Sequence, residues 1–427
     1  MIKLVQITTV PTSLFITAQL TSYIKARGFD VHALSSPGEY LHKYGECIGV
    51  PVHPVEMLRR ITPLRDLVVI FRIWRCLRQI RPLVVHAGTP KGGLLGMISA
   101  WLARVPVRVY HVHGLPFATA TGYKRTLLCW SEKISCLLAH QVLCVSHSNR
   151  ELAVAEGFCP ATKIKVLEHG SPNGVDASGT FNPTLVRKNA RQEIRARYGI
   201  PAEALVVSFV GRIVRDKGLT ELIEAWKMLR EEFPTLHLMI VGVFEPQDPL
   251  PPNVERIMRC DSRIHLTGFI NDMPPIYAAT DVVAFPTYRE GFGNVSIEAS
   301  AMEVPVVGTR VPGCVDSVQD GVTGTLVPPR DAEALAHAIR MYLNDPDLRR
   351  RHGRAGRERV LRDFRPEAIW EAMYQEYERL LRARALPIPE LTSGGAETIS
   401  TARSLVGSPC STKPSPGLST QDPGEPL

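Results

Sequence analysis

The sequence predicts an α/β protein with two doubly wound, Rossmann-like domains that face each other across a cleft. Short apolar runs alternate with helical patterns up to about residue 167, and the alternation restarts at Ala204. A turn-rich stretch, 170–200, separates the two series. The chain has 427 residues, which is enough for two domains with separate cores. We expect a ligand in the cleft, at the carboxyl ends of the strands.

The first domain is expected to span residues 1–176. Its strands are predicted at Ile2–Thr8, Asp30–Leu34, Leu83–His86, Val107–Val112, Gln141–Val145 and Ile164–Leu167. Its helices are predicted near 13–27, 64–80, 92–103, 123–139 and 148–156. This order predicts a parallel sheet covered on both faces.

A polar, basic linker is predicted at 177–203, followed by the second domain at 204–365. The expected strands lie at 204–211, Leu236–Val241, Ile264–Leu266, Val282–Phe285, Val304–Val307 and Thr325–Val327. Helical patterns follow at 331–343 and 346–361, and a last helix is expected within 366–385. Residues 386–427 are rich in Ser, Pro, Gly and Thr, so we predict a disordered tail.

Composition points to an ordinary soluble protein. Hydrophobic residues make up 44% and charged residues 22%. Nine cysteines are scattered without a C-x-x-C pair, which is typical of reduced thiols in a cytoplasmic protein. Met1 leads directly into an apolar run, so we expect no signal peptide, and no apolar run is long enough to cross a bilayer.

The net charge of +8 is concentrated in the first half. Residues 1–180 contain 20 Lys and Arg against 10 Asp and Glu. A basic half favours an anionic partner, namely a membrane surface, a phosphorylated lipid or nucleic acid. A solvated basic surface explains this charge equally well. The segment Leu58–Arg81 combines arginines with apolar residues at helical spacing. It suits an anionic membrane, but more often such a helix has one core face and one solvated face.

Two motifs in the second half point to a diphosphate site. R-E-G-F-G-N-V-S-I-E-A-S (289–300) places Glu290 in a glycine turn and Glu298 two helical turns later. Alone, this spacing is more typical of a surface loop. G-R-I-V-R-D-K-G (211–218) follows a strand and opens a helix, so Arg212, Lys217 and the helix N-terminus suit a diphosphate. It lacks the G-x-G-x-x-G of nicotinamide dehydrogenases.

Candidates for the other side of the cleft lie in the first half. His113 directly follows the predicted strand Val107–Val112 and precedes a glycine, so we expect it to face the cleft. A strand-end histidine satisfied by backbone groups is the alternative. The loop T-P-K-G-G (89–93) suits an anionic acceptor through Lys91, or is an ordinary βα loop. The only D-x-D, Asp345 to Asp347, reads as a helix-capping turn, so we expect no metal.

From about Lys3 to Leu381 the chain resembles the retaining, nucleotide-sugar-dependent glycosyltransferases of the GT-B fold. The most specific strings are R-E-G-F-G-N-V-S-I-E-A-S-A-M-E-V-P-V-V-G-T and G-C-V-D-S-V-Q-D-G-V-T-G-T-L-V-P-P. The strings H-V-H-G-L-P-F-A-T-A-T-G-Y-K-R, V-S-H-S and G-S-P-N-G-V-D resemble the branch that builds capsular, O-antigen and N-glycan-type oligosaccharides on undecaprenyl diphosphate.

The resemblance implies roles for particular residues. Arg212 and Lys217 would hold the diphosphate of a UDP-sugar, Glu290 the sugar hydroxyls, and Glu298 the ribose. The resemblance further implies backbone N–H contacts from Gly291, Phe292 and Gly293, and a place for His113 near the anomeric carbon or the 6-position of the sugar. Independently of the resemblance, the loops and basic charge of the first half make Thr9, Thr89, Lys91, Lys124 and Arg125 the acceptor-side candidates.

The expected reaction needs no metal or other cofactor beyond the UDP-sugar co-substrate. It moves an N-acetylhexosamine or related hexose to a lipid-linked or other saccharide acceptor held by the first domain. The helix within 366–385 would cross back onto that domain. We expect the protein in the cytoplasm, on the inner face of the cell membrane. An anionic membrane surface is an expected partner, and nucleic acid is not.

The chain also departs from the family pattern. Thr8 to Ser13 replaces a frequent Gly-Gly loop, Pro172 interrupts the hinge motif, and the tail has no counterpart. Two alternatives remain open at this point: a GT-B-fold nucleotide-sugar 2-epimerase, and a non-catalytic nucleotide-sugar-binding scaffold.

Overall fold

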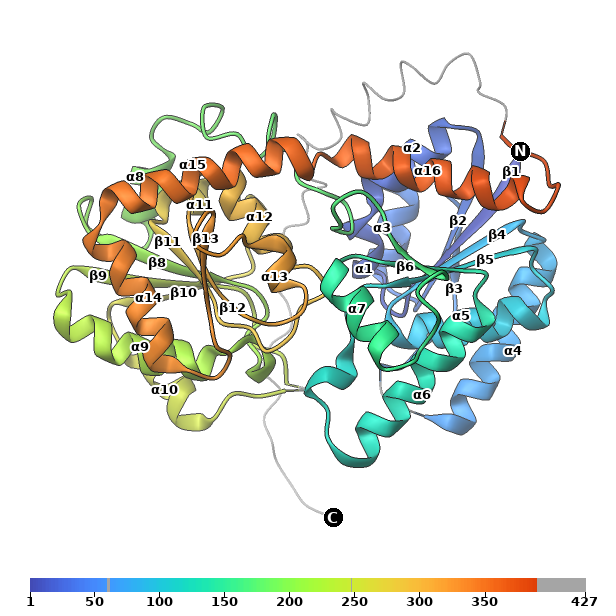
Figure 1. Cartoon of the computed structure of the whole chain (residues 1–427), viewed down its shortest axis with the longest axis horizontal. Helices are drawn as coiled ribbons and strands as arrows, with labels where there is room; N and C mark the ends of the chain where they lie inside the picture. Colours follow the sequence, from blue (N-terminus) through green and yellow to red (C-terminus); the bar gives the residue numbers. More distant parts are fainter. Residues whose placement is uncertain (60–61, 247, 390–427) are drawn as a thin grey trace.

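Each domain of the protein is built on one parallel sheet. The computed structural model describes residues 1–59, 62–246 and 248–389, and the two domains lie side by side (Figure 1). The first sheet has the strand order β3-β2-β1-β4-β5-β6-β7, and the second has β10-β9-β8-β11-β12-β13. All of these pairings are parallel. The predicted pair of doubly wound α/β domains is confirmed.

The elements of the first domain follow the predicted alternation. They are β1 (Ile2–Ile7), α1 (Thr12–Ile16), α2 (Ala18–Ala26), β2 (Phe29–Ser35), α3 (Glu39–Ile48), β3 (Val52–Pro54), α4 (Pro63–Ile80), β4 (Val84–Gly88), α5 (Pro90–Leu102), β5 (Val107–Val112), η1 (Pro116–Thr119), α6 (Gly122–Leu138), β6 (Gln141–Cys144), α7 (His147–Ala155) and β7 (Ile164–Val166). The helix predicted at 13–27 is broken at Thr17, whose backbone is not helical. Helix α3 and the edge strand β3 were not predicted. Strand β3 has only three residues and ends in proline, so its strand signal is weak.

The second domain repeats the pattern. Its elements are α8 (Ala190–Arg197), β8 (Leu205–Val210), η2 (Arg215–Lys217), α9 (Leu219–Glu232), β9 (Leu236–Val241), α10 (Pro252–Cys260), β10 (Ile264–Gly268), α11 (Pro274–Ala279), β11 (Val282–Phe285), α12 (Asn294–Ala301), β12 (Val306–Thr309), α13 (Cys314–Ser317), β13 (Gly324–Val327), α14 (Ala332–Asn344) and α15 (Pro346–Asp363). The side chain of Asp345 accepts a hydrogen bond from Leu348 N and caps α15, as the D-x-D was expected to do.

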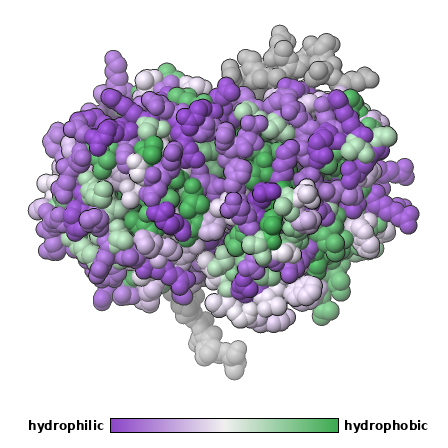
Figure 2. Space-filling model, viewed as in Figure 1, coloured by the Kyte–Doolittle hydropathy of each residue, from purple (hydrophilic) through white to green (hydrophobic). Residues whose placement is uncertain are grey.

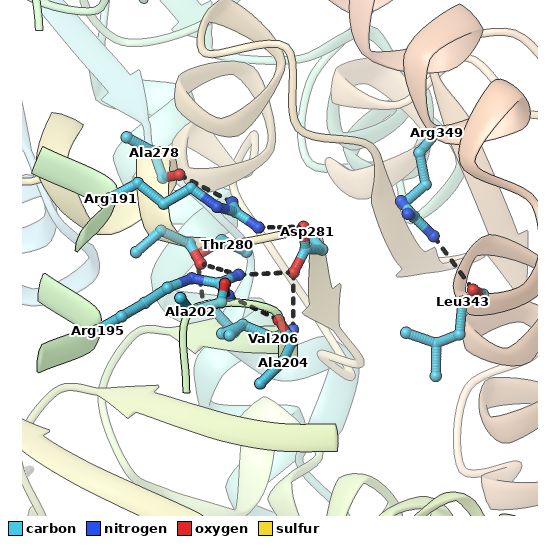
Figure 3. A network of polar contacts seen from close by, with 12 residues as sticks. Arg191, Arg195, Ala202, Ala204, Val206, Ala278, Thr280, Asp281, Leu343 and Arg349 are labelled. Atoms are coloured by element: carbon cyan, nitrogen blue, oxygen red, sulfur yellow. Dashed lines mark hydrogen bonds and ion pairs between the residues drawn. The ribbon is translucent and has the colours of Figure 1, made fainter. Parts of the chain in front are cut away.

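Helix α8 lies inside the segment predicted as a linker, yet it is part of the second domain. Arg195 is buried and donates to the carbonyls of Ala202 and Ala204 (Figure 3). Its guanidinium also lies 3.0 Å from Asp281 Oδ2, just before β11, and Arg191 binds the other oxygen of the same carboxylate. The sequence indicates a linker here because α8 is polar and the carboxylate that its arginines bind lies far away along the chain.

Helix α16 (Pro366–Arg382) follows α15 and packs on the first domain, so α15 and α16 run along one edge of both domains (Figure 1). Its apolar face joins the core that contains β1 and β2 through Trp370, Met373, Tyr374 and Tyr377. Of the predicted disordered tail, residues 390–427 lie outside the described residues. No helix in the described part of the chain combines the length and the hydropathy that crossing a bilayer requires.

Candidate active site

The strand orders place two switch points opposite each other. In the first sheet the order reverses between β1 and β4, and in the second between β8 and β11. Ligands of such sheets bind at the carboxyl ends of these strands. A cavity of about 210 Å³ lies there, which we call the cleft cavity. Its lining residues are Thr89, Pro90, His113, Gly114, Pro116, Arg212, Asp216, Lys217, Arg289, Glu290 and Gly291.

The loop after β8 brings two cations to this cavity. Arg212 is half exposed, and its Nη1 lies 2.8 Å from Glu245 Oε2. Lys217 ends η2, and its Nζ forms an ion pair with Glu290 Oε1 from the loop after β11. Gly218 then precedes α9 with a φ of 69°, and a Cβ there would lie 1.9 Å from Pro286 O. Only glycine lets the chain turn here, and the turn leaves the N-terminus of α9 beside Lys217.

The Glu290 loop is held from across the cleft. The carbonyl of Gly291 accepts hydrogen bonds from Ser146 Oγ at 2.7 Å and Asn149 Nδ2 at 2.8 Å, both in the first domain. A Cβ on Gly291 would lie 2.0 Å from His113 O. The close backbone approach therefore requires glycine and brings Glu290 and His113 to the same cavity.

The remaining residues of the acidic motif, 292–300, support the loop and do not line the cleft cavity. Phe292 is buried against Phe364, with ring centroids 5.3 Å apart, so any contact it makes with a ligand is through its backbone. Gly293 is the left-handed residue that precedes α12. Glu298, on α12, accepts a hydrogen bond from Tyr277 Oη at 2.9 Å, and burial raises its pKa to about 7. Glu298 does not line the cleft cavity.

A chain of buried rings connects α16 to His113. Tyr377 Oη lies 2.5 Å from His86 Nδ1, and His86 Nε2 lies 3.1 Å from His111 Nδ1. The rings of His111 and His113 are 4.3 Å apart. Burial lowers the pKa of His113 to about 4, so its imidazole is neutral near pH 7. A neutral His113 can offer a hydrogen bond to a sugar hydroxyl.

Of the acceptor-side candidates, only Thr89 lines the cleft cavity. Its hydroxyl lies 2.8 Å from that of Thr9, which also accepts from Gly92 N, so these two threonines join the loops after β1 and β4. Lys91 Nζ lies 2.7 Å from Asp66 Oδ1. Its ammonium is therefore held between α4 and α5 rather than presented to the cleft.

Lys124 and Arg125 lie on the first turn of α6, outside the cleft cavity. Arg125 Nη2 lies 2.7 Å from Glu156 Oε1, and its guanidinium covers the ring of Phe117. Lys124 is exposed. The structure therefore separates this pair from the residues that surround His113.

Two sets of contacts at the site were not assigned from the sequence. Arg289 Nη2 lies 2.8 Å from Asp216 Oδ2, and Arg289 Nε donates to Thr119 Oγ1 of the first domain at 2.9 Å. Asp316 of α13 accepts from the backbone N–H of His147 at 2.9 Å and of Ser148 at 3.3 Å, at the start of α7. Asp216, Arg289 and Asp316 stand in the quoted motifs, but Arg289 and Asp316 also contact Thr119 and the start of α7, which lie in the other domain.

Within residues 1–59, 62–246 and 248–389, no group of three His, Cys, Asp or Glu is arranged to hold a metal ion. That the reaction needs no metal stays a prediction.

Comparison with known proteins decides the family. Residues 204–345 match the family model described as glycosyl transferases group 1, and residues 16–170 match the glycosyl transferase 4-like domain. The capsular polysaccharide biosynthesis glycosyltransferase CapM of Staphylococcus aureus is 33% identical over 380 residues, which cover 89% of this chain and 98% of CapM. The chain belongs to the glycosyl transferases group 1 family.

Other relatives of this glycosyltransferase agree with the assignment. The Escherichia coli UDP-Gal:alpha-D-GlcNAc-diphosphoundecaprenol alpha-1,3-galactosyltransferase is 27% identical over 295 residues, covering 68% of this chain and 74% of that protein. Anabaena HepE in complex with UDP-glucose superposes with a TM-score of 0.74 at 21% identity, covering 89% and 100% of the two chains. Sucrose-phosphate synthase from Thermosynechococcus elongatus gives 0.73 at 24% identity, covering 90% and 100%. The fold is therefore GT-B.

Proposed function

We propose that this glycosyltransferase moves a sugar, an N-acetylhexosamine or related hexose, from a UDP-sugar to a hydroxyl of a lipid-linked saccharide, with retention of configuration. The observation that carries the proposal is the meeting of Arg212, Lys217 and Glu290 with His113 at one cavity between the domains. Two cations beside a helix N-terminus suit a diphosphate. A carboxylate and a neutral imidazole suit the hydroxyls of a sugar.

The diphosphate is expected to bind along the loop from Arg212 to Lys217, at the N-terminus of α9. Lys217 is paired with Glu290 in the structure, so donor binding has to share or displace this ion pair. When the bond from sugar to phosphate breaks, negative charge grows on the leaving diphosphate. Preorganised cations and N–H groups stabilise such charge, and this is usually the largest electrostatic contribution to catalysis.

Retention is expected to follow a front-face route. Glu290 pairs with Lys217, and we propose that it also hydrogen-bonds the sugar hydroxyls. It is therefore not assigned as the nucleophile. The acceptor oxygen bonds to the anomeric carbon from the side that the phosphate leaves. The leaving phosphate oxygen takes the acceptor proton, so atoms and charge balance without a covalent enzyme intermediate. His113 stays neutral and donates or accepts one hydrogen bond beside the reacting sugar.

The choice of donor and acceptor is supported by the relatives. The E. coli relative is named for a UDP-galactose donor and a diphosphoundecaprenol acceptor, and the S. aureus relative for capsular polysaccharide biosynthesis. By analogy, we place this protein in the cytoplasm, at the inner face of the membrane that holds such an acceptor. The basic first half of the chain fits that place.

The test is a transfer assay with a panel of UDP-sugars and an undecaprenyl-diphosphate-linked saccharide. Mass spectrometry would identify the elongated acceptor, and NMR would give the configuration of the new bond. We expect elongation with the donor's configuration retained, and loss of product with Lys217→Met. Inverted configuration would contradict the route. An epimerised UDP-sugar formed without acceptor would establish the 2-epimerase, and UDP binding without any turnover would favour the scaffold.

A further inference from the structure

Helix α4 has two apolar stripes, and only one of them reaches the core. Val69, Ile73, Leu77 and Ile80 are buried against the first sheet. A second stripe on the opposite side is exposed to solvent and consists of Leu64, Leu67, Val68 and Phe71. Arg75 and Arg78 continue this second stripe at the same helical spacing and are also exposed. The outer side of α4 is therefore apolar in its first half and cationic in its second half.

Helix α6 repeats this arrangement. Glu132, Ser135 and Cys136 face inward. The outer stripe consists of Tyr123, Trp130, Ile134 and Leu137, which are spaced by three, four or seven residues and are all exposed. Lys124 and Lys133 are exposed on either side of this stripe.

The two stripes lie on one side of the first domain. Helices α4 and α6 both pack against α5, which lies between them, and the last turn of α5 exposes Trp101 and Leu102. We call this surface the α4–α6 face. Figure 2 shows apolar side chains gathered over this part of the molecule, at the lower right. An apolar surface of this kind on a soluble domain marks a site of interaction.

The charge of the α4–α6 face identifies the partner. The exposed cations on α4 and α6 are Arg65, Arg72, Arg75, Arg78, Lys124, Arg125 and Lys133. The three helices contain two carboxylates, and neither is presented to the outside. Asp66 is paired with Lys91, and Glu132 is buried, where it accepts a hydrogen bond from Tyr110 Oη at 2.7 Å.

We infer that the α4–α6 face docks on an anionic lipid bilayer, with the apolar stripes in the interface and the cations among the headgroups. This combination of exposed aromatic and aliphatic side chains with Lys and Arg is what an interfacial surface requires. A second copy of the chain fits less well. A two-fold contact would place this cationic face against itself, and no exposed carboxylate of α4, α5 or α6 is available to balance it.

The position of the face connects it to the cleft. Helix α5 begins at Pro90, which lines the cleft cavity, and α6 begins just after η1, whose Pro116 also lines it. The exposed apolar half of α4 is its N-terminal half, which lies at the same edge of the sheet because Lys91 binds Thr62 and Asp66. Docking would therefore set the cleft next to the bilayer. This consequence rests on the proposed function, since only a lipid-linked acceptor must enter from the membrane.

The test is flotation of the full chain with phosphatidylcholine vesicles that contain or lack phosphatidylglycerol. We expect the wild type to float only with the anionic vesicles. Phe71→Ser with Trp130→Ser, whose side chains are 56% and 61% exposed, should lower the bound fraction about tenfold or more. Arg75→Glu with Arg78→Glu should have an effect of similar size and remove the difference between the two vesicle types. Because all four side chains are exposed, the melting temperature should stay unchanged.

Matched variants on the second domain serve as controls. Phe269→Ser replaces an aromatic residue that is 77% exposed, and Arg351→Glu with Arg354→Glu reverses two exposed cations on α15. These variants should float like the wild type. Absence of the wild type from the floating fraction, or equal loss in the controls, would overturn the inference. So would a lipid-free dimer, seen by light scattering, that Phe71→Ser with Trp130→Ser dissociates. UDP binding, measured without vesicles, tests the donor site separately, so the two proposals can fail independently.

Discussion

Lys217 and Glu290 form an ion pair that joins the loops after β8 and β11, on either side of the switch point of the second sheet. Both side chains are only about one-seventh exposed, at 15% and 14%. Removal of either partner leaves the other charge poorly solvated. The pair is therefore both a structural link and the place where a bound diphosphate would compete for the ammonium.

Replacement of Lys217 by methionine should lower kcat by about 100-fold to 1,000-fold, because the transition-state charge on the diphosphate loses a preorganised partner. UDP affinity should fall much less. Steady-state kinetics and calorimetric titration with UDP measure the two effects separately. Arg215→Met is the control, since Arg215 is exposed in the same turn and does not line the cleft cavity. An unchanged kcat with weaker binding would count against this role.

Replacement of Glu298 by glutamine should weaken UDP binding about tenfold to 100-fold, since hydrogen bonds to a charged group are stronger than those to an amide. Burial raises the pKa of Glu298 to about 7, and ribose hydroxyls need the ionised carboxylate as acceptor. Wild-type affinity should therefore rise as the pH increases through about 7. The variant should show only the titration of the nucleotide itself. Parallel pH curves for the two proteins would argue that Glu298 does not contact the ribose.

Replacement of Asp316 by alanine should loosen the contact between the domains. The carboxylate caps α7 from across the cleft, and such a cap contributes about 1 kcal/mol. Small-angle scattering of the nucleotide-free protein should show a larger radius of gyration, and donor affinity should fall. Asp345→Ala removes a cap within one domain and should change neither quantity. An unchanged scattering profile for Asp316→Ala would show that other contacts determine the closed arrangement.

Glu132 should lower the stability of the protein as the pH rises from about 4.5 to about 7, in opposition to the buried histidines, whose lowered pKa values raise stability over the same range. Burial raises the pKa of this carboxyl from 4.5 to about 7, although the hydrogen bond from Tyr110 lowers it somewhat. Between these values the folded state keeps a proton that the unfolded state has lost, so unfolding becomes easier with increasing pH. Glu132→Gln should remove up to about 3 kcal/mol of this decline. Urea unfolding across this pH range measures the change in stability, and the exposed Glu151→Gln is the control. The same slope of stability against pH in Glu132→Gln as in the wild type would contradict the assignment.

The sequence was informative where a residue lies in the loop that follows a buried strand. Arg212, Glu290 and His113 each lie in such a loop, and the doubly wound order brings the ends of those strands to one cleft. Their expected roles toward donor and sugar stay predictions. Their convergence on one cavity is a finding.

What the sequence could not reveal are partners that lie far away along the chain. Lys91 pairs with Asp66, and Arg195 pairs with Asp281, and no local sequence pattern predicts either contact. The contact of Ser148 with Asp316 spans 168 positions and depends on the relative placement of two domains. Secondary structure was missed where elements are short or polar, as in β3 and α8.

The most direct test of the donor site is thermal stabilisation by UDP, GDP, ADP and NAD, measured for the wild type, Lys217→Met and Glu298→Ala. A ligand at about 100 times its Kd adds roughly 2.7 kcal/mol to the free energy of unfolding. We predict a rise in Tm that is largest with UDP, slightly smaller in Lys217→Met and strongly reduced in Glu298→Ala. No rise with any nucleotide, or the same rise with UDP in Glu298→Ala as in the wild type, would contradict a UDP-sugar site at this cleft.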